Sequence, residues 1–250
     1  MQQLAAASWE AYRRARDNRI EALVRPSLPI LFFGDDERYF ASPRRIVTVG
    51  LNPSPREFPL RDPFERFPAA RDIDPDAPNL LLHLTALRDY FRKRPYDTWF
   101  KPGFEPLLKG LDASYYDGGA TQNTALHTDI CSPLATDPTW TGLNKGSDVL
   151  LADGIGLWHR LVERLAPDVI LISVANHHLN RIRFPQLEPW RVLYTVERLH
   201  PFEVRAKRVI ITAEKSALLV FGRNVNLPFG SVNALDKQTI GCVIKEALDG

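Results

Sequence analysis

The spacing of apolar residues along the chain predicts several helices and several buried strands. Apolar positions recur every three or four residues from Leu4 to Val24, which predicts an amphipathic helix that Pro26 and Pro29 end. The same spacing predicts further helices, which span about 80–94, 104–111, 150–165 and 234–248. Short apolar runs rich in β-branched residues predict strands buried on both faces, at 46–51, 124–130, 168–174 and 217–221.

Strands and helices alternate along the chain, and this order is typical of a parallel sheet with helices on both faces. We therefore predict an α/β fold with three layers, α/β/α, around a central, mainly parallel sheet, and a single domain over 1–250. The segments 191–198 and 208–212 predict paired strands, which would form a hairpin inserted at about 181–212. Residues 53–78 hold seven prolines, so we expect a long loop there with little regular structure.

Length and composition indicate an ordinary globular protein. The 250 residues are 44% hydrophobic and 25% charged, which argues against disorder, and no apolar run approaches the length of a membrane span. Charged residues interrupt the first twenty positions, so we expect no secretory signal. The two cysteines, Cys131 and Cys242, cannot build a disulfide framework or a four-thiolate zinc site. We expect a cytoplasmic protein with no membrane association and no obligatory protein partner.

Polar residues follow four of the predicted strands, where the carboxyl ends of parallel strands would bring them together. These residues lie in 50–54, 127–133, 175–178 and 223–228. The chain has no P-loop and no Gly-x-Ser-x-Gly elbow, and its single Gly-x-Gly, at 154–156, falls inside a predicted helix, so we predict no cofactor. His127, Asp129 and His177 have the side chains that divalent metals take as ligands. Adjacent histidines on an extended segment point opposite ways, however, and we predict no metal site.

The run Val47-Thr-Val-Gly-Leu-Asn-Pro-Ser54 resembles the first motif of the uracil-DNA glycosylase superfamily, in which a strand ends in Gly-x-Asp/Asn-Pro. The sequence after the second strand, Asp129-Ile-Cys-Ser-Pro-Leu134, is similar to the base-recognition strand of that superfamily. The resemblance covers most of residues 44–248 in order. It implies the same α/β fold and an enzyme that hydrolyses the N-glycosidic bond of a damaged or deaminated, uracil-like base in DNA.

The resemblance also implies roles for residues of the first motif. Asn52 would position the attacking water as a catalytic residue, although an amide cannot accept the proton of that water at neutral pH. Gly50, Leu51 and Pro53 would lie against the substrate. Asp129 would face the base, because a carboxylate accepts a hydrogen bond from a base N–H.

Two segments compete for the second motif of the superfamily, which would stabilise the departing base. His200-Pro-Phe202 keeps a His-Pro pair, whereas the loop from Asn226 to Ser231 has the expected position between the last strand and the closing helix. A phenylalanine of the proline-rich loop would stack on the base once it is flipped out of the DNA. The candidates for this stacking are Phe58, Phe64 and Phe67.

Two basic runs indicate DNA, single- or double-stranded, as the partner, since nucleic acid is bound largely through its phosphates. The first run lies within 88–101 and the second within 181–208. The formal charge of +2 permits an anionic partner without requiring one. Two other interpretations stay open: a non-catalytic member of the same fold that binds nucleic acid or protein, and a metal-dependent hydrolase of nucleotides.

Overall fold

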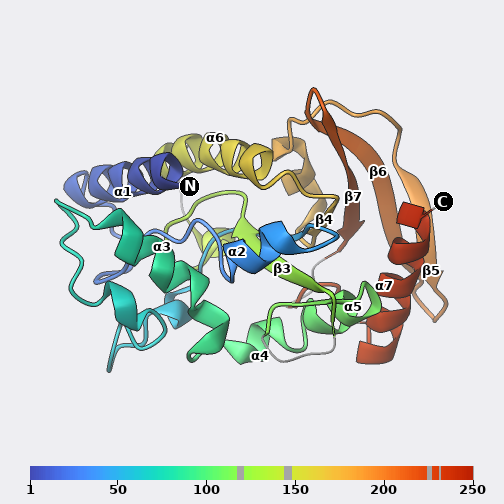
Figure 1. Ribbon diagram of the computed structural model, residues 1–250, viewed down its shortest axis with the longest axis horizontal. Helices are drawn as coiled ribbons and strands as arrows, with labels where there is room; N and C mark the ends of the chain where they lie inside the picture. The colour runs from blue at the N-terminus through green and yellow to red at the C-terminus, as the bar shows by residue number, and fades with distance from the viewer. Residues whose placement is uncertain (117–120, 144–147, 224–226, 231, 250) are drawn as a thin grey trace. The chain divides into compact units, whose positions relative to one another are not determined.

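The computed structural model describes residues 1–250 except 117–120, 144–147, 224–226, 231 and 250 (Figure 1). The chain forms two compact units, and each unit is assembled from three segments that are far apart in the sequence. Unit 1 consists of Met1–Asp35, Gly50–Tyr96 and His127–Arg164. Unit 2 consists of Asp36–Val49, Asp97–Leu126 and Leu165–Gly250. The single uracil-DNA-glycosylase-like domain over 1–250 stays a prediction.

A mixed sheet forms the framework of unit 2. Within the described residues it has seven strands, in the order β2-β3-β1-β4-β7-β6-β5. The strands are β1 (Ile46–Gly50), β2 (Ala113–Ser114), β3 (Asn123–Asp129), β4 (Val169–Ile172), β5 (Arg191–Val196), β6 (Phe202–Thr212) and β7 (Lys215–Gly222). The last residues of β1 and β3 belong to unit 1, and the polar residues that follow these two strands therefore lie in unit 1.

The central strands are apolar and buried, as their sequence predicts. Every residue of β1 and of β4 is buried, which agrees with the continuous apolar runs at these positions. The pairs β1–β4, β4–β7 and β2–β3 are parallel. These pairs and the helices confirm the predicted α/β class, while its arrangement in three layers stays a prediction.

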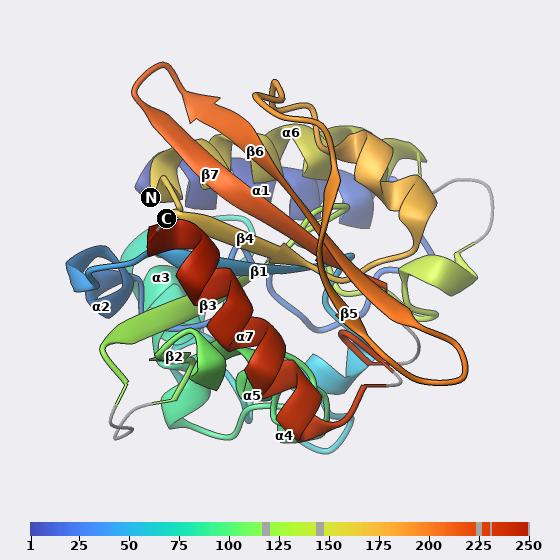
Figure 2. The ribbon, with the colours of Figure 1, turned by 90° about the vertical axis from the view of Figure 1, so that its right-hand side faces the viewer.

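The strand β6 is longer than the sequence predicts. It spans Phe202–Thr212 and pairs antiparallel with β5 through its first half and with β7 along most of its length (Figure 2). The predicted pairing of 191–198 with 208–212 is therefore wrong. Charged side chains alternate with buried apolar ones over 203–207, and this period of two is typical of a strand with one solvated face.

Helices α5 and α7 of unit 2 cross at a pair of glycines (Figure 2). A Cβ at Gly241 would lie 2.1 Å from Leu107 O, and a Cβ at Gly110 would lie 2.1 Å from Gln238 O. The backbones approach this closely only because both residues lack a side chain. The helices of unit 2 are α2 (Asp36–Ala41), α4 (Asp97–Phe100), α5 (Glu105–Gly110) and α7 (Ala234–Asp249).

Unit 1 contains α1 (Gln2–Asp17), α3 (Leu80–Arg88) and nearly all of α6 (Asp148–Leu165). The predicted helix over 4–24 is too long, because Arg19 has a φ of 53° that a right-handed helix cannot contain. Residues 53–78 hold only single 3-10 turns, as the prolines predict. The 3-10 turns of the described chain are η1 (Pro55–Glu57), η2 (Pro68–Ala70), η3 (Tyr90–Arg92), η4 (Trp140–Gly142) and η5 (Asn176–Arg181). No helix of the described chain has the length and apolar character needed to span a bilayer.

We expect Gly241→Ala to lower the free energy of unfolding by about 1–3 kcal/mol, because the added methyl group forces two backbones apart. Gly156→Ala in α6 is the matched control, since an added Cβ there meets nothing within 4 Å. This control should gain about 0.5–1 kcal/mol from helix propensity alone. Urea denaturation of both variants measures the two changes, and changes of the same sign would contradict the close crossing.

Candidate functional site

The Gly50-Leu-Asn-Pro53 motif leaves the end of β1 and lies beside the residues that follow β3 in unit 1. The Ile130 amide donates to Gly50 O at 3.1 Å, and the Cys131 amide donates to Leu51 O at 2.8 Å. Both bonds involve residues at or beyond the carboxyl ends of the strands. The motif and the segment after Asp129 are therefore adjacent, as the strand-end rule predicts.

Gly50 leaves room for two polar side chains. A Cβ at this position would lie 2.6 Å from Asp129 Oδ1 and 3.2 Å from His127 Nε2. Both side chains are buried, and their Oδ1 and Nε2 atoms are 3.6 Å apart. The His127 ring also lies 5.6 Å from the ring of Phe33, centroid to centroid. The glycine of the motif is thus required by close contact, because any side chain would displace the carboxylate.

The side chain of Asn52 holds the motif to the chain that follows β3. Its Nδ2 donates to Thr136 Oγ1 at 2.8 Å and to Leu134 O at 3.2 Å, with a further contact to Pro53 O at 3.0 Å. Its Oδ1 accepts from the Trp140 amide at 3.0 Å. The two N–H groups are therefore committed, and one lone pair of Oδ1 is left for a water.

Glu57, at the end of η1, is a buried carboxylic acid in the same unit. Its Oε2 accepts a hydrogen bond from the Tyr90 hydroxyl at 2.5 Å, and that hydroxyl accepts one from the Tyr96 amide at 2.9 Å. Burial raises the pKa of Glu57 to about 7, and the negative charge of Asp129 adds to this, whereas the bond from Tyr90 and the charge of Arg66 act in the opposite direction.

Tyr90, the hydrogen-bond donor to Glu57, belongs to a chain of aromatic rings in unit 1. The Tyr90 ring contacts Phe33 and Phe67, at centroid distances of 4.8 and 5.3 Å. Phe67 stacks on Phe58 at 5.5 Å, and Phe58 meets Phe64 edge to face at 6.4 Å. Phe58 and Phe67 are buried, whereas Phe64 is half-buried. Among the three phenylalanines of the loop, Phe64 is thus the candidate for stacking.

Seven of the predicted site residues lie in the same unit, and the others do not. Those that lie in unit 1 are Gly50, Leu51, Asn52, Pro53, Phe58, Phe64 and Asp129. His200 belongs to unit 2, where it is exposed in the connection between β5 and β6, and its carbonyl accepts from Arg198 Nε at 2.8 Å. Asn226 and Ser231 lie outside the described residues.

Two residues of the cluster, Glu57 and Tyr90, are absent from the sequence prediction. Glu57 lies in a proline-rich loop without periodicity, where an acidic residue is usually solvated. Tyr90 occupies one of the apolar positions of the helix predicted over about 80–94. The signal in the sequence is indirect: Glu57 directly precedes Phe58 in the proline-rich loop, five residues after Asn52.

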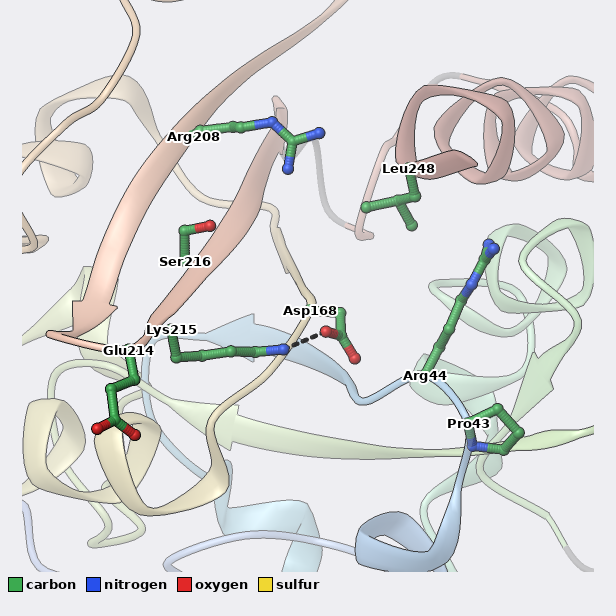
Figure 3. Close-up of a pocket in the computed structure, with 8 residues that line it drawn as sticks. All are labelled: Pro43, Arg44, Asp168, Arg208, Glu214, Lys215, Ser216 and Leu248. Carbon is green, nitrogen blue, oxygen red and sulfur yellow. Dashed lines mark hydrogen bonds and ion pairs between the residues drawn. The ribbon is translucent and has the colours of Figure 1, made fainter. Parts of the chain in front are cut away.

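A second polar feature, a cleft of about 450 Å³, lies in unit 2 (Figure 3). Asp168 directly precedes β4 and Lys215 begins β7, so the cleft lies at the amino ends of these parallel strands. Lys215 Nζ donates to Asp168 Oδ1, and the Arg45 amide donates to Asp168 Oδ2 at 2.8 Å. The cleft is lined by Pro43, Arg44, Asp168, Arg208, Glu214, Lys215, Ser216 and Leu248. It contains none of the predicted site residues.

Among the described residues, no group of three or more His, Cys, Asp and Glu side chains is arranged to hold a metal ion. His127 and Asp129 are neighbours in unit 1, whereas His177 belongs to unit 2. Comparison of the chain with protein-family models, with curated proteins and with solved structures found no match. The geometry of the residues is therefore the basis of the functional argument.

The raised pKa of Glu57 makes stability depend on pH in a defined direction. The folded value of about 7 exceeds the usual 4.5, so this contribution to stability is complete below about pH 4.5 and is lost as the pH rises through 7. Between about pH 5 and pH 8 we expect the wild type to lose roughly 2–3 kcal/mol of unfolding free energy relative to Glu57→Gln. Urea denaturation at both pH values measures this, and parallel pH profiles of the two proteins would refute the raised pKa.

Proposed function

We propose that the chain is a DNA glycosylase-like protein that hydrolyses the N-glycosidic bond of a uracil-like base in DNA. The observation that supports this proposal is the buried pair of His127 and Asp129 beside Gly50 of the Gly50-Leu-Asn-Pro53 motif. The same unit holds a buried carboxyl group, Glu57, whose raised pKa suits a proton acceptor. The resemblance of the motif to the uracil-DNA glycosylase superfamily indicates the reaction class.

Glu57 is the residue we assign to proton transfer. Cleavage of the bond leaves a sugar with oxocarbenium character, and the attacking water must lose a proton as it adds. A carboxyl group with a pKa of about 7 is suited to accept this proton near neutral pH, where a general base works best when its pKa matches the ambient pH. Asn52 is then a positioning residue, whose amide holds the motif and whose remaining Oδ1 lone pair orients the water.

Asp129 and His127 are the groups we assign to the base. The Asp129 carboxylate accepts from an N–H of a pyrimidine, and the His127 ring has a nitrogen able to donate to a carbonyl oxygen of the base. Phe64 supplies the ring on which a flipped base stacks. The predicted donors to the departing base are not part of this site, because His200 belongs to unit 2 and Asn226 lies outside the described residues. We place the activity in the cytoplasm, since the thiols of Cys131 and Cys242 are both free.

A second candidate, a nucleic-acid-binding protein of the same fold without turnover, is favoured by one observation. The Asn52 amide is largely committed to Thr136, Leu134 and Trp140, which is the environment of a structural asparagine. Such a protein would bind DNA through the same residues and release no base.

The purified chain, incubated with single-stranded and duplex oligonucleotides that contain uracil, distinguishes these candidates. We expect an abasic product whose formation is insensitive to a chelator and rises with pH to a plateau above about pH 7, where Glu57 is ionised. Tight binding without product would favour the second candidate. Chelator-sensitive turnover would contradict both.

The variant Glu57→Gln tests the assigned base directly. It keeps the size of the side chain but cannot accept a proton, so we expect base release to fall by about 10²–10⁴-fold and to lose its pH dependence. Glu65→Gln is the matched control, because Glu65 lies in the same loop and pairs with Arg94 at 3.1 Å outside the cluster. Equal rates for Glu57→Gln and the wild type would remove Glu57 from the mechanism.

A further inference from the structure

One face of β6 in unit 2 presents two cations in sequence. Residues alternate between the two faces of a strand, so Arg205 and Lys207 share one face with the exposed Glu203, while Val204 and Ala206 are buried on the other. Both cationic side chains are half-buried. Two residues along a strand correspond to about 6.6 Å, so the two charges are held side by side at a fixed spacing.

The indole of Trp190, just before β5, lies against both cations. Lys207 Nζ is 4.9 Å from the centre of the Trp190 ring, and Arg205 Cζ is 6.0 Å from it. Arg205 Cζ is also 5.3 Å from the centre of the Phe221 ring on β7. These cation–π contacts orient the two cations on an aromatic support. We refer to Trp190, Arg205, Lys207 and Phe221, with Asn176, as the Trp190 surface.

No carboxylate of the described residues forms an ion pair with either cation of the Trp190 surface. The one hydrogen bond of the Arg205 guanidinium is to a neutral group, Asn176 Oδ1, at 3.0 Å. On the same hairpin Arg208 pairs with Glu188 at 3.8 Å, which shows that a counter-charge is available there and is used one residue further along. Burial lowers the pKa of Lys207.

Half-buried cations without a counter-charge have lost part of their hydration and gained little in return. An anion that binds between them regains this energy. A guanidinium forms paired hydrogen bonds to phosphate oxygens, an ammonium acts as a point charge, and an indole offers a surface for a base or a sugar. Neighbouring phosphates of an extended strand are spaced so that residues two apart on a β-strand can contact one phosphate each.

From this arrangement we propose that Arg205 and Lys207 bind consecutive phosphates of a nucleic acid strand, while Trp190 contacts a base or a sugar of that strand. The choice of DNA as that nucleic acid rests on the proposed function, whereas the phosphate chemistry rests on the charges and the indole alone. Binding at this surface requires no chemical step and no base of a particular type.

The test is a titration of a fluorescein-labelled single-stranded DNA that contains no uracil, followed by anisotropy at several salt concentrations. Each phosphate contact contributes about 0.7 to the slope of log K against log salt for single strands. We expect Arg205→Gln/Lys207→Gln to reduce this slope by about 1.4 and to weaken binding at low salt. The charge-conserving variant Arg205→Lys/Lys207→Arg should keep the wild-type slope.

A matched control removes the same charge from elsewhere in unit 2. Lys109→Gln/Lys245→Gln alters α5 and α7 and should leave the slope unchanged. An equal loss in this control, an unchanged slope in Arg205→Gln/Lys207→Gln, or no binding by the wild type would each overturn the proposal. Circular dichroism and thermal unfolding verify that every variant is folded.

The result of this salt titration does not depend on the result of the uracil-release assay. A chain that binds this probe through Arg205 and Lys207 but releases no uracil would support the Trp190 surface and refute the enzyme. A chain that releases uracil, but whose slope of log K against log salt does not change in Arg205→Gln/Lys207→Gln, would support the enzyme and refute the Trp190 surface.

Discussion

The hydrogen bond between two buried groups, the Glu57 carboxyl and the Tyr90 hydroxyl, is the interaction on which the chemistry proposed for unit 1 depends. Glu57 donates or accepts according to its protonation, and Tyr90 keeps a hydroxyl hydrogen bond to it while the Tyr96 amide satisfies that hydroxyl in turn. Burial and the charge of Asp129 both favour the neutral acid. Gly50 leaves the space that the Asp129 carboxylate occupies, and the charge of this carboxylate helps to raise the pKa of Glu57.

The Asn52 side chain has a structural role that the proposed chemistry would use. Its N–H groups bond to Leu134 and Thr136, and its oxygen accepts from the Trp140 amide. These bonds hold the strand-end motif in place, as the proposed hydrolysis requires of a residue that orients a water. In that proposal the proton of the water goes to Glu57, whose pKa of about 7 suits a general base near neutral pH.

The sequence predicts those elements whose apolar pattern lies within one short segment of the chain. The apolar runs of β1 and β4 predicted buried parallel strands, and the strand-end rule placed Gly50 beside Asp129. Glu57 could not be predicted, because its hydrogen-bond donor Tyr90 is 33 residues away in the sequence. The first half of β6 carries the alternation of a strand with one solvated face and is not a continuous apolar run, which is the pattern that predicts the buried strands. The apolar spacing predicts a longer first helix than α1, because it does not reveal the turn at Arg19.

The most direct test of this account is the titration of the Glu57 carboxyl carbon by nuclear magnetic resonance, with the resonance assigned from its absence in Glu57→Gln. The account predicts a midpoint near pH 7, the pKa that burial and Asp129 produce together. A midpoint near the usual 4.5 would mean that water reaches this carboxyl group. That result would contradict both the burial of Glu57 and its assignment as the general base.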